Sequence, residues 1–205
     1  LNTGISTNPI FQAFIHTVKE YKIDYHYIDA FLKSMEMDLT NSYYEPQHYN
    51  EYIYGSAEVV GLMCLQVFTG NDKILFNELI EPARSLGSAF QKVNFLRDIK
   101  SDMEERERIY LPGVNHAIKI DDENKRNLEK EIEIEFQKAL IGIKKLPVGV
   151  KLGVYSAYLY YKGLFKKIKR LKIKELMNER VRVSNATKIA LFLRSLLEIK
   201  ILKLT

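Results

Sequence analysis

The chain of 205 residues is long enough for one domain with a sizeable core, and its 46% hydrophobic content is typical of a globular protein. Its net charge of +5 suits diphosphates, acidic lipid or nucleic acid without selecting among them. The single cysteine, Cys64, excludes an intramolecular disulfide framework. No signal peptide is visible, so we expect a cytoplasmic location. Peripheral contact with the inner face of a membrane is a further possibility within this expectation. Few Pro and Gly and almost no strand patterns predict an all-α fold.

The first third of the chain reads as three helices. Asn8 and Pro9 are typical of a helix start, and a second helix is expected over about 24–37. Asp38 follows it, either as a helix-end residue or as part of an active site. The third helix, over 49–68, is apolar nearly all round and so should be central to the fold. Its small residues indicate either tight core packing or close approach of a long ligand chain.

The most informative stretch is 86–112, for which a helix is expected from about Pro82. Four polar residues share one narrow stripe at helical spacing: Gln91, Asn94, Asp98 and Asp102. Apolar residues occupy the opposite side and supply a core-facing surface. Two carboxylates one turn apart repel each other unless a cation lies between them, and Asp and Asn oxygens are hard ligands. The stripe therefore predicts one wall of a Mg²⁺ or Mn²⁺ site.

The last third predicts helices over about 121–145, 151–177 and 185–200, with a break at Pro147. Basic residues gather near the end of the second of these: Lys166, Lys167, Lys169, Arg170, Lys172 and Lys174. Such a run is either a solvated face or a contact for an anionic membrane surface. Nucleic acid is disfavoured as a partner because no groove-reading motif accompanies the charge.

The stripe belongs to a longer pattern, Gln91-x-x-Asn94-x-x-Arg97-Asp98-x-x-x-Asp102 followed by Arg-Ile-Tyr-Leu-Pro over 108–112. This pattern resembles the second aspartate-rich signature of the squalene/phytoene synthase family. The 49–68 helix resembles another family segment through Tyr52, Tyr54, Ala57, Val60 and Gly61, although Glu58 stands where Gly is usual. The Glu-Arg-Val of 179–181 resembles the family's closing segment, so the resemblance covers nearly the whole chain.

The resemblance implies an isoprenoid-synthase-type helical bundle around a central apolar cavity. It also implies head-to-head condensation of two prenyl diphosphates through a cyclopropyl intermediate, with geranylgeranyl diphosphate giving phytoene in carotenoid biosynthesis. A squalene- or dehydrosqualene-type enzyme that uses farnesyl diphosphate is the alternative, with NADPH only in the squalene type. From another class, a non-catalytic relative acting as an assembly protein, or a basic helical module at a membrane, also stays open.

The resemblance assigns roles residue by residue. Metal ligands would be Asn94, Asp98 and Asp102, with both aspartates and Tyr54 as catalytic residues. Substrate contacts would come from Gln91, Asn94, Arg97, Arg108, Tyr110, Tyr52, Ala57 and Gly61. Arg108 either contacts diphosphate or pairs with Glu104 or Glu105, and Arg97 either reaches diphosphate or braces Asp98.

One departure concerns the opposite wall of the site. Family members carry a first aspartate-rich motif on an earlier helix, and no such motif precedes the 49–68 helix here. We therefore expect 1–205 to be a single partial domain that lacks the N-terminal helices of its family. With one acidic wall the isolated chain is expected to be inactive, whereas the full-length parent is expected to be a synthase.

Overall fold

The computed structural model describes residues 6–40, 44–105, 108–111 and 121–200, and the elements in these ranges are all helical, as predicted. In chain order they are α1 (Pro9–Glu20), α2 (Tyr25–Thr40), α3 (Pro46–Ile53), the π-helical turn η1 (Tyr54–Glu58), α4 (Val59–Thr69), α5 (Lys73–Glu104), α6 (Asp122–Lys145), α7 (Val148–Lys169), α8 (Ile173–Leu176) and α9 (Asn185–Lys200). The predicted Asn8 cap is confirmed, since its side chain accepts hydrogen bonds from the backbone N–H groups of Ile10 and Phe11.

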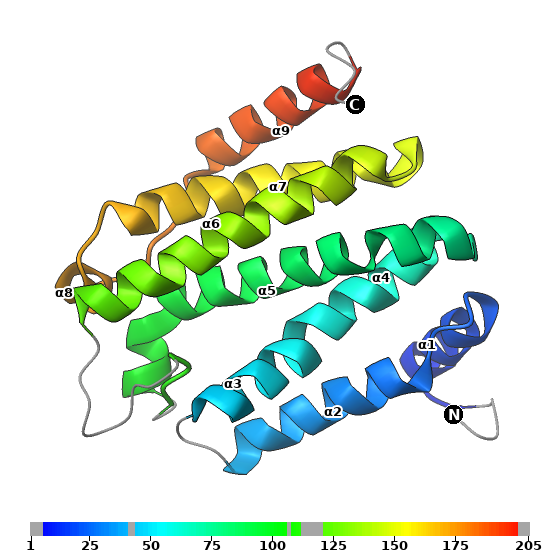
Figure 1. The fold of residues 1–205 in the computed structure, drawn as a ribbon, viewed down its shortest axis with the longest axis horizontal. Helices are drawn as coiled ribbons and strands as arrows, with labels where there is room; N and C mark the ends of the chain where they lie inside the picture. The colour runs from blue at the N-terminus through cyan, green and yellow to red at the C-terminus, as the bar shows by residue number, and fades with distance from the viewer. Residues whose placement is uncertain (1–5, 41–43, 106–107, 112–120, 201–205) are drawn as a thin grey trace.

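The long helix α5 runs through the middle of the molecule (Figure 1). The continuous rod of α3, η1 and α4 packs on one side of it, with α2 beyond, and α6 and α7 pack on the other side, with α9 against α7. The largest core cluster lies between α5, α6 and α7 and includes Ala89, Val93 and Leu96, which are fully buried. The predicted core-facing side of the signature helix is thereby confirmed.

The start of α5 corrects the predicted start near Pro82. The helix begins about two and a half turns earlier, at Lys73, because the Asp72 side chain accepts hydrogen bonds from the backbone N–H groups of Ile74 and Leu75. Pro82 lies inside the helix and packs against Gly142 of α6, where an added Cβ would come within 2.2 Å of the proline ring. The small residue opposite Pro82 therefore allows α6 to approach α5 closely.

The predicted 49–68 helix is continuous in direction but interrupted by the π-helical turn η1. Glycines let this rod lie against both neighbours. A Cβ on Gly55 would come within 2.4 Å of a carbonyl of α2, and a Cβ on Gly87 of α5 would come within 2.5 Å of the Ala57 carbonyl. The segment Pro46–Thr69 is long and apolar enough to cross a membrane, with a mean hydropathy of 1.2. Core helices of soluble proteins can have the same length and hydropathy. Here it packs between α2 and α5, and 44% of its most apolar window is buried.

The helix predicted over 151–177 is wrong at its C-terminal end. It ends at Lys169, and a separate short helix, α8, follows. The Asp122 carboxylate at the start of α6 accepts a hydrogen bond from the backbone N–H of Ile173 and so fixes the first turn of α8. This long-range bond marks the start of a separate helix within the run that was predicted to be one continuous helix.

Candidate functional site

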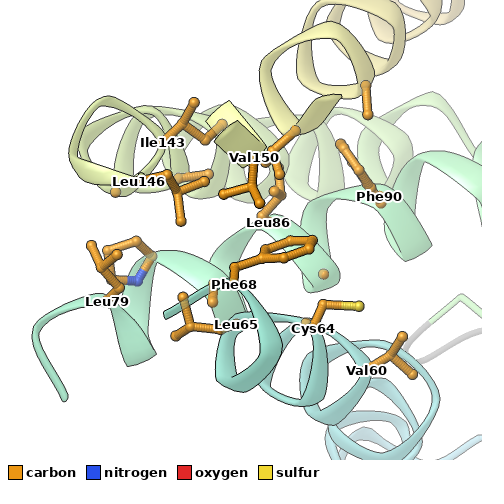
Figure 2. Close-up of a pocket in the computed structure, with 18 of the residues that line it drawn as sticks. Val60, Cys64, Leu65, Phe68, Leu79, Leu86, Phe90, Ile143, Leu146 and Val150 are labelled. Carbon is orange, nitrogen blue, oxygen red and sulfur yellow. The ribbon is translucent and has the colours of Figure 1, made fainter. Parts of the chain in front are cut away.

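An apolar cavity of about 640 Å³ lies between α4, α5, α6 and α7 (Figure 2). Ala57 and Gly61, two residues expected at a ligand chain, line it. Most other lining side chains are also apolar: Val60, Leu65, Phe68, Leu79, Pro82, Leu86, Phe90, Ile143, Leu146, Val150 and Val154. A space of this size with almost no polar atoms favours a long hydrocarbon ligand over a polar metabolite.

Gln91 lines the cavity and is also the first member of the polar stripe on α5, so the stripe begins where the cavity ends. The next member, Asn94, accepts a hydrogen bond from the Tyr161 hydroxyl (3.2 Å) and donates one to Gln91 (3.4 Å). Tyr161 in turn stacks on Phe90, with ring centroids 3.9 Å apart. Tyr161 belongs to the tyrosine-rich face of α7, but its pairing with Asn94 was not predicted. These contacts hold the two amides in fixed orientations at the polar end of the cavity.

Asp98 lies between two guanidinium groups. Arg97 donates two hydrogen bonds to it (2.9 and 2.5 Å), and Arg180 lies 2.6 Å from its Oδ1. Burial alone would raise the pKa of Asp98, but these two arginines hold that pKa below its ordinary value. Arg97 thus braces Asp98, and its expected reach to a diphosphate stays a prediction. Arg180 was missed as a site residue, and the Glu-Arg-Val of 179–181 was the signal that pointed to it.

Asp102 is the most enclosed member of the stripe, with 5% of its surface exposed. Its carbonyl accepts a hydrogen bond from the backbone N–H of Arg108 (2.8 Å), which turns the chain back at the end of α5. Across the described ranges no three His, Cys, Asp or Glu side chains gather closely enough to hold a metal ion. The stripe nevertheless supplies carboxylate and amide oxygens, so its donor chemistry fits one wall of a site for a hard divalent cation.

Arg108, Tyr52 and Tyr110 meet at Asp38, outside the residues that line the cavity. The Tyr52 and Tyr110 hydroxyls donate hydrogen bonds to the Asp38 carboxylate (3.1 and 2.9 Å), and Tyr44 adds a third (3.2 Å). The Arg108 guanidinium donates to the Asp38 carbonyl and lies 3.8 Å from its carboxylate. Arg108 thus pairs with Asp38 rather than with Glu104 or Glu105. Asp38 is the anchor of a cluster that joins α2, α3 and the segment after α5. Pro112 of the signature lies outside the described residues.

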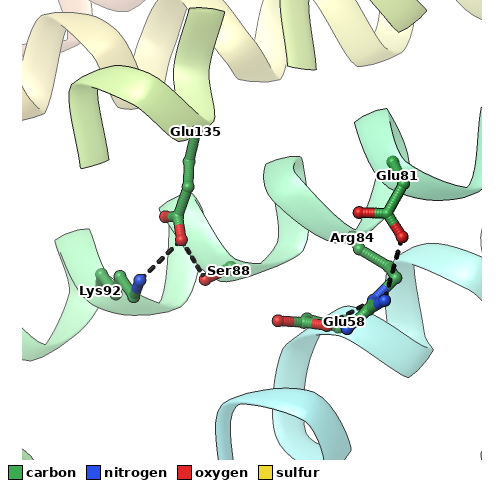
Figure 3. Close-up of polar contacts among 6 residues, drawn as sticks. All are labelled: Glu58, Glu81, Arg84, Ser88, Lys92 and Glu135. Carbon is green, nitrogen blue, oxygen red and sulfur yellow. Dashed lines mark hydrogen bonds and ion pairs between the residues drawn. The ribbon is translucent and has the colours of Figure 1, made fainter. Parts of the chain in front are cut away.

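Tyr54 also lies outside the lining of the cavity, under the Arg84 guanidinium, which is 5.6 Å from the centre of its ring. Arg84 bridges Glu58 (2.7 Å) and Glu81 (3.0 Å), as Figure 3 shows. Glu58, at the position where the family usually has Gly, therefore joins η1 to α5 by an ion pair. The roles expected for Tyr52, Tyr54, Tyr110 and Arg108 at the substrate stay predictions.

A second polar network that sequence reasoning missed joins α5 to α6 (Figure 3). The Lys92 amine, with 9% of its side chain exposed, lies 2.6 Å from Glu135 and 3.1 Å from Glu131, and Ser88 donates a hydrogen bond to Glu135 (2.8 Å). Burial lowers the pKa of Lys92, but the two glutamates outweigh it, so the amine stays charged. The signal was a lysine and a serine one turn apart on an otherwise apolar side of α5.

A family model described as squalene/phytoene synthase matches residues 2–119, more than half of the chain. The chain belongs to the squalene/phytoene synthase family. Among curated proteins, 15-cis-phytoene synthase of Synechocystis sp. is 32% identical over 178 residues, covering 74% of this chain and 52% of the relative. The 15-cis-phytoene synthase of Pantoea ananas is 29% identical, covering 79% of this chain and 56% of the relative. The chain thus spans about half the length of the curated relatives it matches.

Solved structures show the same fold. A dehydrosqualene synthase in complex with ligand matches with a TM-score of 0.80 at 21% identity, covering 97% of this chain and 74% of that one. The squalene synthase HpnC of Alicyclobacillus acidocaldarius matches with a TM-score of 0.70 at 18% identity, covering 82% of this chain and 68% of that one. The predicted isoprenoid-synthase-type helical bundle around an apolar cavity is therefore confirmed.

Proposed function

We propose that this chain forms the second aspartate-rich wall and the prenyl-chain cavity of a transferase that joins two prenyl diphosphates head to head. Geranylgeranyl diphosphate as substrate and phytoene as product are the favoured reading, because the curated relatives are phytoene synthases. A farnesyl-using squalene or dehydrosqualene synthase is the alternative. A scaffold protein is disfavoured, since it would have no use for the five aligned signature residues or for a prenyl-sized cavity.

The observation that carries the proposal is the continuity of α5 from a polar stripe into an apolar cavity. A prenyl diphosphate has the same division, with a charged head and a long hydrocarbon tail. Gln91 lies at the junction, with Asn94 one turn further toward the carboxylates and Phe90 on the cavity side. The apolar walls keep water from an allylic cation, which is what a carbon–carbon bond-forming step between prenyl groups requires.

The polar end of the site fits a metal-bound diphosphate. Asn94, Asp98 and Asp102 would hold Mg²⁺ or Mn²⁺, which would neutralise the charge of the leaving diphosphate. Arg97 and Arg180 stand at the same carboxylate, and their guanidinium groups match phosphate oxygens bidentately. We assign no residue of the chain to NADPH binding. We also propose that the protein lies at the inner face of a membrane.

The test is calorimetric binding of the unreactive thiolodiphosphate analogue of geranylgeranyl diphosphate to the 205-residue chain. We expect binding that strengthens at least tenfold on adding Mg²⁺, because the metal links the diphosphate to the stripe. Asp98→Asn should abolish the Mg²⁺ effect while leaving most of the tail-dependent affinity. Asp29→Asn, an exposed acid on α2, is the matched control and should change nothing. Equal affinity with and without Mg²⁺ in the wild type would contradict the metal-diphosphate assignment.

A second measurement separates transferase from scaffold. The same titration is repeated with inorganic diphosphate, which represents the charged head, and with the prenyl alcohol, which represents the hydrocarbon tail. It tests whether both bind at the same site. We expect each to compete with the intact analogue, because the stripe and the cavity meet at Gln91. Independent, non-competing binding would show that the two features do not form one substrate site.

A further inference from the structure

Helix α9 is attached to the rest of the molecule by polar side chains. The Ser195 hydroxyl, which is fully buried, lies 2.7 Å from the Ser156 hydroxyl of α7. Nearer the end of α9, the Tyr155 hydroxyl of α7 donates a hydrogen bond to the Glu198 carboxylate, which Arg194 also contacts (2.8 Å). Glu198 is the one acidic residue of α9, so the helix turns its only carboxylate toward the protein.

The outer side of α9 is apolar and faces solvent. Its large side chains are 47% to 61% exposed: Ile189, Phe192, Leu193 and Leu197. They recur at intervals of three and four residues and so form one stripe along the helix. Figure 1 shows α9 at the outer edge of the molecule, against α7. A surface helix of a globular protein normally turns its apolar stripe toward the core, so the stripe on α9 indicates a second apolar environment on its outer side.

The positive charge of the chain is concentrated around this stripe. Residues 162–200, which run from the second half of α7 to the end of α9, carry twelve basic and three acidic side chains. Over the rest of the chain acidic side chains outnumber basic ones, although the net charge of the whole is +5. The Lys167 amine donates a hydrogen bond to the Arg182 carbonyl (3.1 Å), which places the basic end of α7 beside the start of α9. Lys188 and Lys200, both exposed, lie on α9 itself. An anionic surface at this side of the molecule would therefore meet apolar and basic groups together.

The size and charge of the stripe favour a lipid surface over a second copy of the chain. A helix of sixteen residues is about 24 Å long and, at a width of about 10 Å, offers roughly 240 Å² on one side. A stable protein–protein interface buries about 800 Å² on each partner, more than three times as much. The excess of positive charge would also make two such faces repel each other. A lipid surface needs no matching pocket, accepts one convex apolar helix and, if anionic, attracts the surrounding lysines and arginines.

We propose that α9 is a membrane-docking helix: its apolar stripe enters the interface of an anionic bilayer, while Lys188, Lys200 and the basic end of α7 pair with lipid phosphates. The inference rests on the membrane location proposed above and adds which surface makes the contact. Helix α7 connects this surface to the cavity, because Val154 lines the cavity and the neighbouring Tyr155 holds α9. The condensed product of two prenyl groups is a hydrocarbon, so docking through α9 brings the cavity close to the lipid phase in which that product dissolves.

The experiment is flotation of the 205-residue chain with vesicles of phosphatidylcholine, either alone or with about 30 mol% phosphatidylglycerol. The wild type should bind the anionic vesicles at least tenfold more tightly than the neutral ones, and added salt should remove most of that difference. Phe192→Ala should weaken binding to anionic vesicles at least fivefold, because it removes apolar surface from the lipid interface. The double substitution Lys188→Gln and Lys200→Gln should weaken binding to anionic vesicles to a similar extent and leave binding to neutral vesicles within about twofold.

The matched control is Phe11→Ala, which removes a phenylalanine of at least equal exposure from α1, on the other side of the molecule (Figure 1), and should leave binding within about twofold. Phe192→Leu keeps an apolar side chain and should retain most of the binding that Phe192→Ala loses, with circular dichroism showing that each variant is folded. Absence of vesicle binding by the wild type, or equal binding by Phe192→Ala, would overturn the inference. Dimerisation in sedimentation equilibrium that Phe192→Ala abolishes would also overturn it, because a second copy would then cover the stripe.

The titration with the thiolodiphosphate analogue reports on the proposed substrate site independently of the vesicles. A chain that binds the analogue but not the vesicles would refute the docking role of α9 and leave the transferase assignment intact. A chain that binds vesicles through α9 but not the analogue would support the docking role and contradict the transferase assignment.

Discussion

Replacement of Asp38 tests whether this carboxylate holds the segment after α5 against α2 and α3. Asp38 accepts hydrogen bonds from three tyrosine hydroxyls at 2.9 to 3.2 Å and lies beside the Arg108 guanidinium. A hydrogen bond to a charged group contributes about 1.5–3 kcal/mol, but the Asp38 side chain is 20% exposed, which favours the low end. Asp38→Ala leaves Tyr44, Tyr52 and Tyr110 without this acceptor and should lower the free energy of unfolding by about 3–4 kcal/mol. Asp38→Asn, which keeps one oxygen, should cost roughly half as much.

The assay is urea unfolding followed by circular dichroism at 222 nm, with thermal unfolding as a second readout. For a domain of this size each kcal/mol moves Tm by about 2–4 °C, so Asp38→Ala should lower Tm by roughly 10 °C. Asp29→Ala, an exposed position on the same helix, controls for helix propensity and should stay within about 0.5 kcal/mol of wild type. A loss below about 1 kcal/mol for Asp38→Ala would refute the view that the cluster is a structural anchor, and would favour a direct role of Arg108 at the substrate.

Three further predictions concern α5 and its neighbours. Gly87→Ala should lower the free energy of unfolding in urea by about 1–3 kcal/mol, because the added Cβ would come within 2.5 Å of backbone. Gly153 has open space around it, so Gly153→Ala should raise the free energy of unfolding by about 0.5–1 kcal/mol. Equal effects of the two substitutions would contradict the close helix contact at Gly87. The pKa of Asp98 lies below its ordinary value of 3.8, so its contribution to folding stability is present above about pH 4 and is lost as the pH falls further. Asp98→Asn should therefore reduce the loss of stability at acid pH. An unchanged loss would refute the pairing of Asp98 with Arg97 and Arg180. Lys92→Ala should cost about 3–5 kcal/mol, because it removes the cation that neutralises Glu135 and leaves that carboxylate only the Ser88 hydrogen bond. Adding Glu135→Gln should recover part of that loss in the same assay.

Helix positions and the polar stripe were predictable because they depend on local spacing. The 3.6-residue period places Gln91, Asn94 and Asp98 on one face of any helix that contains them, whatever packs around it. Helix ends were less predictable. Asp72 is a local cap signal for the start of α5, whereas a proline inside a helix is unusual, and Gly142 on α6, which accommodates Pro82, is distant in sequence. The start of α8 is bonded by a residue of another helix, which has no local signal.

The partners of the site residues were not predictable, because they come from segments that only the fold brings together. Nothing near Asp98 in the sequence indicates that Arg180 reaches it, and nothing near Asp38 indicates that Tyr110 does. The sequence motif identified the candidate residues, but only the folded structure shows which of them are in contact. Four residues whose substrate roles stay predictions lie beside Asp38 or Arg84: Tyr52, Tyr54, Arg108 and Tyr110.

The two arginines at Asp98 give the proposed diphosphate site a low electrostatic barrier to loading. Arg97 and Arg180 neutralise the carboxylate, so the polar end of α5 does not repel an incoming diphosphate as bare aspartates would. Asp98 would hold the cation of a metal-bound diphosphate, and the guanidinium groups of Arg97 and Arg180 would pair with its phosphate oxygens. Every charge then keeps an opposite partner, and the exchange avoids the desolvation cost of an unpaired ion. Arg180, with half of its side chain exposed, is the partner that is freer to move, whereas Arg97 is held on α5 beside Asp98.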